Sequence, residues 1–110
     1  MQHRDYVIIQ KVISEIKIGQ EMLGGISLQE FLQDEKLKRA VAMTVINIGE
    51  LVKNITQETR LTHSDIPWRE IAGMRDMAAH KYQTLRMEDV YLTAKEDFPV
   101  LLEKLNQIKE

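Results

Sequence analysis

The chain is 110 residues long, 44% hydrophobic and 29% charged, which is typical of one globular domain and excludes a disordered polymer. Fifteen lysines and arginines against 17 aspartates and glutamates give a net charge of −2, which excludes a globally basic nucleic-acid binder; any contact with RNA must be a local patch. The absence of cysteine excludes disulfides and thiolate metal sites. The sequence has neither a run of about 20 apolar residues nor a leader pattern, so we expect one cytoplasmic domain over residues 1–110, with no membrane partner.

The first predicted helix runs from about Asp5 to Leu23. Ile8, Val12 and Ile16 step by four and form an apolar stripe along it. The pair Gly24-Gly25 predicts its end.

Two start signals follow. Ser27 with Glu30 three residues later is a capping box and predicts a short helix. Asp34 is the predicted N-cap of a long helix that ends near Arg60.

The long helix has two apolar flanks. One is a seam with alternating steps of four and three, as in coiled coils. Its members are Val41, Val45, Ile48, Val52 and Ile55, and the second flank is Met43, Ile46 and Leu51. Both flanks should be covered, either inside one chain or in a dimer, and the residues leave both possibilities open.

A polar linker over 61–66 precedes Pro67, which we expect at the first position of a helix that runs to Tyr82. The last helix starts near Met87, and its apolar stripe keeps its phase through Pro99, which predicts one kinked helix. The predicted fold is therefore all-α, an up-and-down bundle of four to five helices.

The helix before Tyr82 carries the candidate chemistry. At about 100° per residue, and with Arg75 at zero, Asp76 lies near 100°, His80 near 140° and Tyr82 near −20°. These four polar side chains share one arc, and the small Ala79 leaves its middle uncrowded. A phosphate could approach there.

Those residue types suit phosphoryl chemistry on RNA. Arg75 offers a fork of donors for phosphate oxygens, and His80 titrates near neutrality and can move protons. Asp76 lies four residues before His80, so its carboxylate can orient the ring. Read structurally, however, Arg75 and Asp76 are solvated surface and His80 is a helix-terminal charge, and spacing alone does not decide between the two readings.

The wider context resembles the HEPN domain, and within it the HepT-like ribonuclease toxins. The matching segment is Arg75-Asp76-Met77-Ala78-Ala79-His80-Lys81-Tyr82, preceded by an Ile66-Pro67-Trp68 run. Ile46-Asn47-Ile48-Gly49-Glu50 and Asp97-Phe98-Pro99 extend the resemblance over essentially the whole chain. Asp76 stands where asparagine is frequent and Tyr91 where tryptophan is frequent.

The resemblance implies a homodimer in which two Arg75/His80 pairs face each other across a cleft and cleave RNA without a metal ion or other cofactor. Asp76 would support His80. The resemblance also implies a toxin–antitoxin pair, in which a nucleotidyltransferase antitoxin of the MntA type neutralises the chain by adding AMP to Tyr82.

Other candidates are weaker. A metal site from His63, Asp65 and Glu70 has no helical ligand pattern. Three further basic residues could line an RNA path: Lys53, Lys81 and Arg86. Two other functions stay open: a HEPN dimer that binds a nucleotide or a nucleotidyltransferase without cutting RNA, and a helical adaptor.

Overall fold

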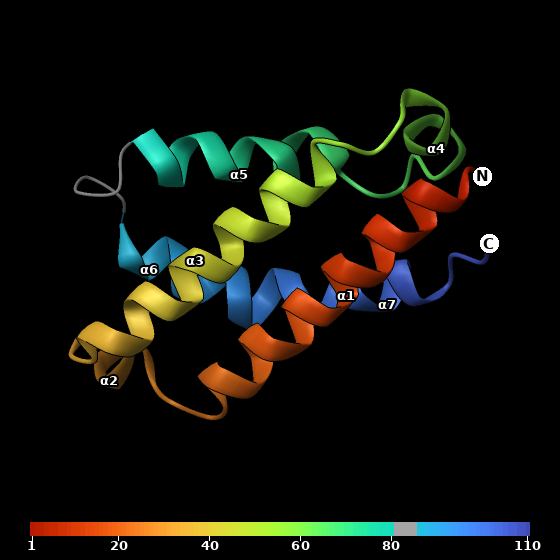
Figure 1. Ribbon diagram of the computed structural model, residues 1–110. Coiled ribbons are helices and arrows are strands. Elements are labelled where there is room, and N and C mark those ends of the chain that lie inside the picture. Colours follow the sequence, from red (N-terminus) through yellow and green to blue (C-terminus); the bar gives the residue numbers. More distant parts are fainter. Residues whose placement is uncertain (81–85) are drawn as a thin grey trace.

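The computed structural model describes residues 1–80 and 86–110, with side chains described through residue 74 and again from residue 86. The elements are α1 His3–Leu23, α2 Leu28–Leu32, α3 Glu35–Val52, α4 Gln57–Thr62, α5 Trp68–His80, α6 Met87–Leu92, the π-helical segment η1 Thr93–Asp97 and α7 Phe98–Asn106. In Figure 1, α1, α3 and α5 lie side by side, and α6, η1 and α7 lie behind them. The chain reverses direction from α1 to α3, to α5 and to α6–α7. Over the described residues there is no strand, and the all-α, up-and-down prediction is confirmed.

The local start and stop signals act as predicted. Gly24 ends α1 in the left-handed region, with φ 53°, and its amide donates to the carbonyl of Gln20. Ser27 and Glu30 form both hydrogen bonds of the capping box at α2. The Asp34 carboxylate accepts from the amide of Leu37 at the start of α3.

The long helix is shorter than predicted. It ends at Val52 instead of near Arg60, and Thr56 opens the separate helix α4 as its N-cap. The Arg60 guanidinium folds back from α4 and donates to the carbonyls of Val52, at 2.9 Å, and Ile55, at 3.2 Å. Because these bonds satisfy carbonyls near the end of α3, they stabilise the break that the apolar phase did not reveal.

The break in the chain is also fixed from α1, because Asp5 reaches it with a fully buried side chain. Asp5 accepts from the amide of Thr56 at 3.2 Å, from the Thr56 hydroxyl at 2.5 Å and from the Thr59 hydroxyl at 2.7 Å. Burial alone would raise the pKa of the Asp5 carboxyl, but these hydrogen bonds hold that pKa below its ordinary value. Asp5 is therefore buried and ionised and fixes the start of α1 to α4, although the sequence indicates only that it begins the first helix.

One helix boundary and one helical turn in the second half differ from prediction. Pro67 lies at the N-cap of α5, where its carbonyl accepts from the Ile71 amide, and Trp68 is the first helical residue. The last helix is continuous through Pro99, as predicted, but contains η1, where the Phe98 amide donates to Thr93, five residues back. This wider turn lets the helix continue next to Pro99, which has no amide hydrogen to donate.

The core is built on the predicted seam, whose five residues are at most 6% exposed; four of them lie on α3, and Ile55 follows in the turn before α4. The second flank is only partly covered within the chain: Leu51 packs against the core and Ile46 is half-buried, but Met43 is 55% exposed. On the other side of the core, α1 approaches α7 closely at Gly19. A Cβ at Gly19 would lie 2.9 Å from the Phe98 ring of α7, so α1 and α7 need a glycine there.

Candidate functional site

The described half of α5 establishes which side of this helix meets the core. Trp68 and Ile71 are buried at 5% and 3% exposure, and Met74 is half-buried against the core. Arg69 and Gly73 are exposed, and a Cβ at Gly73 would meet nothing within 4 Å. The helix therefore packs one face on α3 and leaves the opposite stripe open.

The candidate residues follow on the last turns of the same helix. The structure places Arg75, Asp76 and His80 within α5 but describes none of their side chains. On an ideal helix the positions of Asp76 and His80 continue the exposed stripe of Gly73, three and seven residues later. On the same geometry the position of Arg75 lies about 40° from that of Ile71, at the border of the face that packs on α3.

The remaining candidates are not assembled by the described residues. Lys81 and Tyr82 lie outside them. Arg86 is exposed just before α6 and forms an ion pair with Glu88 at 3.5 Å. Lys53 lies at the end of α3 next to α4, at the other end of the layer from the start of α6 (Figure 1). Thus Lys53 and Arg86 do not share one basic patch.

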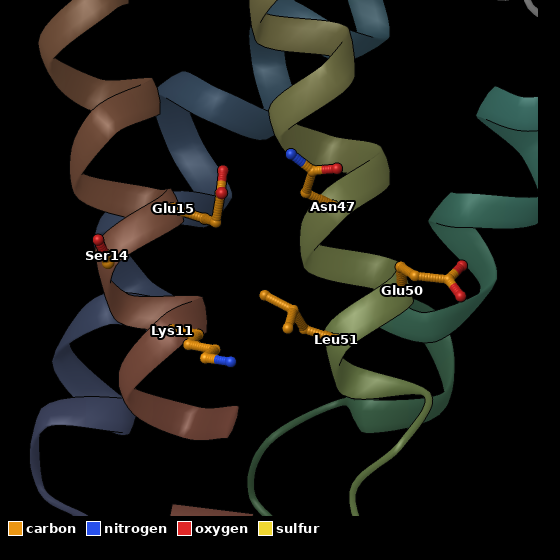
Figure 2. Close-up of a pocket in the computed structure, with 6 residues that line it drawn as sticks. All are labelled: Lys11, Ser14, Glu15, Asn47, Glu50 and Leu51. Carbon is orange, nitrogen blue, oxygen red and sulfur yellow. The ribbon is translucent and has the colours of Figure 1, made fainter. Parts of the chain in front are cut away.

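A polar hollow of about 340 Å³ lies on the outer surface of α1 and α3. Figure 2 shows Lys11 and Glu15 of α1 and Leu51 of α3 pointing toward the space between the helices. Glu50 projects instead to the side of α3 where α5 lies. Because the hollow is shallow and carries charges of both signs, it is not a ready-made phosphate site.

Comparison with known proteins decides the family. The family model described as Ribonuclease HepT-like matches residues 9–108. The chain belongs to the HepT-like ribonuclease family.

Relatives of this HepT-like chain carry consistent names. It is 35% identical over 100 residues, 91% of its own length and 89% of the relative's, to a candidate RNase of Caldanaerobacter subterraneus subsp. tengcongensis. It is 34% identical over 108 residues, 98% of its own length and 96% of the relative's, to a candidate ribonuclease HepT of Thermococcus cleftensis. No solved structure matches the chain.

The metal alternative finds no support in the HepT-like fold. Among the residues that the structure describes, no group of three or more histidines, aspartates and glutamates could hold a metal ion. His63 is half-buried, and its carbonyl accepts from the Trp68 indole at 2.9 Å. His63, Asp65 and Glu70 therefore do not form the site that their closeness in sequence allowed.

None of the described helices combines the length and the apolar character that crossing a membrane requires.

Asp97, which entered the sequence analysis only through the resemblance, lies near the motif helix in the structure. It ends η1 and, with Met74 of α5, the residue directly before Arg75, lines a hollow separate from the one between α1 and α3. The signal for it was the Asp97-Phe98-Pro99 run, because a proline inside an uninterrupted apolar phase calls for an irregular turn.

Proposed function

We propose that this HepT-like chain is an endoribonuclease, the toxin of a toxin–antitoxin pair, with Arg75 and His80 as its catalytic residues. The observation that carries the proposal is the Arg75/His80 pair on the last turns of α5, within a family match that spans residues 9–108. An adaptor or a pure binding module has no need of a group that titrates near neutrality at this position.

The reaction needs a base, an acid and stabilisation of charge. A histidine removes the proton from the ribose 2′-hydroxyl, whose oxygen attacks the adjacent phosphorus; the bond to the 5′-oxygen breaks and that oxygen takes up a proton. The products are a 2′,3′-cyclic phosphate and a 5′-hydroxyl. Arg75 donates to the phosphate oxygens while charge develops on them, and Asp76 orients the ring of His80.

The motif supplies one histidine per chain, His80, and a single histidine cannot be base and acid in the same step, so we propose that a homodimer supplies the second. The partly covered flank of α3 supports an interface at this surface. Gly19 of α1 lies opposite Thr44 of α3. Because the two helices are antiparallel, one residue earlier on each turns Ile18 and Met43 toward the same face, about 3 Å apart along the axes. They are 46% and 55% exposed, an apolar pair of the kind found at protein interfaces.

The cleavage chemistry is tested with purified chain and single-stranded RNA in excess EDTA. We expect cleavage that leaves a 2′,3′-cyclic phosphate, and resistance of RNA with a 2′-deoxy nucleotide at the scissile position. His80→Ala, purified in the same way, controls for contaminating nucleases. Activity that disappears in EDTA and returns with a divalent cation would contradict the proposal.

Regulation is proposed at Tyr82, by AMP transferred from a partner nucleotidyltransferase antitoxin. An AMP on that hydroxyl would bring a phosphate to the motif and repel incoming RNA. After co-expression with the partner enzyme, intact mass spectrometry should show AMP-sized increments on the wild type and none on Tyr82→Phe.

Tyr91→Phe is the matched control for this experiment. The Tyr91 ring is 5% exposed, and its hydroxyl donates to the carbonyl of Ile26 at 2.7 Å and accepts from Lys95 at 3.1 Å. The Tyr91→Phe variant should keep the AMP increments, because the buried and hydrogen-bonded Tyr91 hydroxyl is a poor acceptor of AMP. Increments that survive Tyr82→Phe would place the modification elsewhere.

A further inference from the structure

A second hollow lies on the other side of α3, between α5 and the η1–α7 segment, and has a volume of about 370 Å³. Ile48 of α3 belongs to its lining, with Ile71 and Met74 on one side and Phe98 and Leu101 on the other. This volume of about 370 Å³ is about two and a half times the roughly 150 Å³ that holds a benzene molecule in an apolar cavity. The hollow therefore has room for two large apolar side chains.

The hollow opens to the surface along one edge. Val100, in its lining, is 55% exposed, and Pro67, at the start of α5, is exposed as well. This edge gives it the form of a groove between two helices, the geometry in which proteins bind an amphipathic segment of a partner.

The charged residues at the mouth of the groove determine which charge a bound segment should carry. Glu70 on α5 and Asp97 on η1 are exposed, and neither has an ion-pair partner within the part of the chain that the structure describes. Lys104 also lines the groove, but its ammonium donates to the Asp65 carbonyl at 2.9 Å. This hydrogen bond leaves Lys104 its positive charge, so the two carboxylates and the ammonium give the lining a charge of −1. Such a mouth disfavours the polyanion RNA and attracts a cation.

We propose that this groove docks a basic amphipathic segment of a partner protein. Two apolar side chains of that segment fill the hollow, and lysines or arginines beside them lie over Glu70 and Asp97. The occupant contacts Met74, the residue before Arg75, so docking reaches the motif helix without using the motif. The inference holds whether or not the chain cleaves RNA.

The test uses the absence of cysteine from the chain, because Val100→Cys then provides a single thiol at the edge of the groove. Three peptides, each with one cysteine, are compared as mixed disulfides. One has two leucines flanked by lysines, one replaces the lysines by glutamates, and one replaces the leucines by serines. The measurement is the 2-mercaptoethanol concentration at which half of each disulfide is lost.

We expect the basic leucine peptide to tolerate at least about tenfold more reductant than either variant peptide, which corresponds to about 1.4 kcal/mol. Leu92→Cys is the matched control: Leu92 is 42% exposed on α6, near Glu88 and Asp89, but does not line the hollow. On Leu92→Cys, the leucine and serine peptides should lose half of their disulfide at the same 2-mercaptoethanol concentration. Adding Glu70→Gln and Asp97→Asn to Val100→Cys should remove the preference for lysine and keep that for leucine.

Each other outcome overturns the proposal. Equal tolerance of the leucine and serine peptides at Val100→Cys would mean that the hollow binds nothing apolar. The same ranking of the three peptides at Leu92→Cys would mean that the acidic surface in general, and not the groove, determines the preference. Disulfide formation between two copies of Val100→Cys in preference to all peptides would assign the groove to a second copy of the chain. Circular dichroism checks that each variant is folded.

Discussion

The α1–α4 junction and the last turns of α5 both carry polar residues on helices, and they use them differently. At the junction, Asp5 is fully buried and its hydrogen bonds join residues more than 50 positions apart in sequence. On α5, Arg75 and His80 lie within one short segment. On an ideal helix, the position of His80 falls on the stripe of the exposed Gly73. A polar group buried at a junction contributes to stability, whereas one outside the core phase is available for chemistry. Substitutions should therefore separate stability from activity.

The largest expected effect is on catalysis. His80→Ala should lower the single-turnover rate of RNA cleavage by about 10²–10⁴-fold, the usual contribution of a general acid or base. The melting temperature should change little, because the position of His80 lies away from the face that packs on α3.

Arg75 requires a finer comparison, because its position is closer to α3. Arg75→Lys keeps the positive charge but loses the bidentate fork, so it should lose rate while the fold is retained. Arg75→Ala should lose more rate than Arg75→Lys. Wild-type cleavage by either His80→Ala or Arg75→Ala would move the chemistry away from α5.

The second effect concerns the proposed dimer. Met43→Glu places a charge on the partly covered flank of α3 and should raise the dimer dissociation constant by about 10–100-fold, or 1.4–2.8 kcal/mol. Sedimentation equilibrium measures this constant. Leu61→Glu is the control, because Leu61 is 67% exposed on α4 and should leave association unchanged. Equal association of the two variants would exclude the α3 flank as the interface.

The same contrast explains what sequence alone could predict. Gly24, Ser27 and Asp34 set helix ends by local rules, and the α3 seam follows from a period, so both were predictable. The end of α3 at Val52 was not, because it depends on hydrogen bonds from Arg60 and on contacts of Thr56 with another helix.

The candidate site divides in the same way. The Arg75/His80 motif is local, so the sequence reveals it, and the structure confirms that both positions lie on α5. The groove with Glu70 and Asp97 joins two segments of the chain that only the fold brings together. No periodicity or spacing in the sequence could have identified it.

The smallest expected effect is at the junction, where Asp5→Asn keeps the shape of the side chain and removes its charge. The carboxylate accepts three hydrogen bonds, and an amide, with one acceptor oxygen, cannot replace all of them. We expect the free energy of unfolding at pH 7 to fall by about 1–2 kcal/mol. Urea denaturation measures it, and cleavage per folded molecule should be unchanged.

The pH dependence of that loss identifies the carboxylate as its cause. The folded pKa of Asp5 is lowered, so its stabilisation is complete above the unfolded pKa of about 3.9 and is lost as the pH falls through the folded value. The difference between wild type and Asp5→Asn should therefore shrink below about pH 4. Lys38 also lowers the pKa of Glu35, but the Glu35 carboxylate is exposed to solvent, which screens the pair, and Glu35→Gln should change stability little at any pH. A difference for Asp5→Asn that stays constant from pH 7 to pH 3 would mean that packing, and not the buried charge, holds α1 to α4.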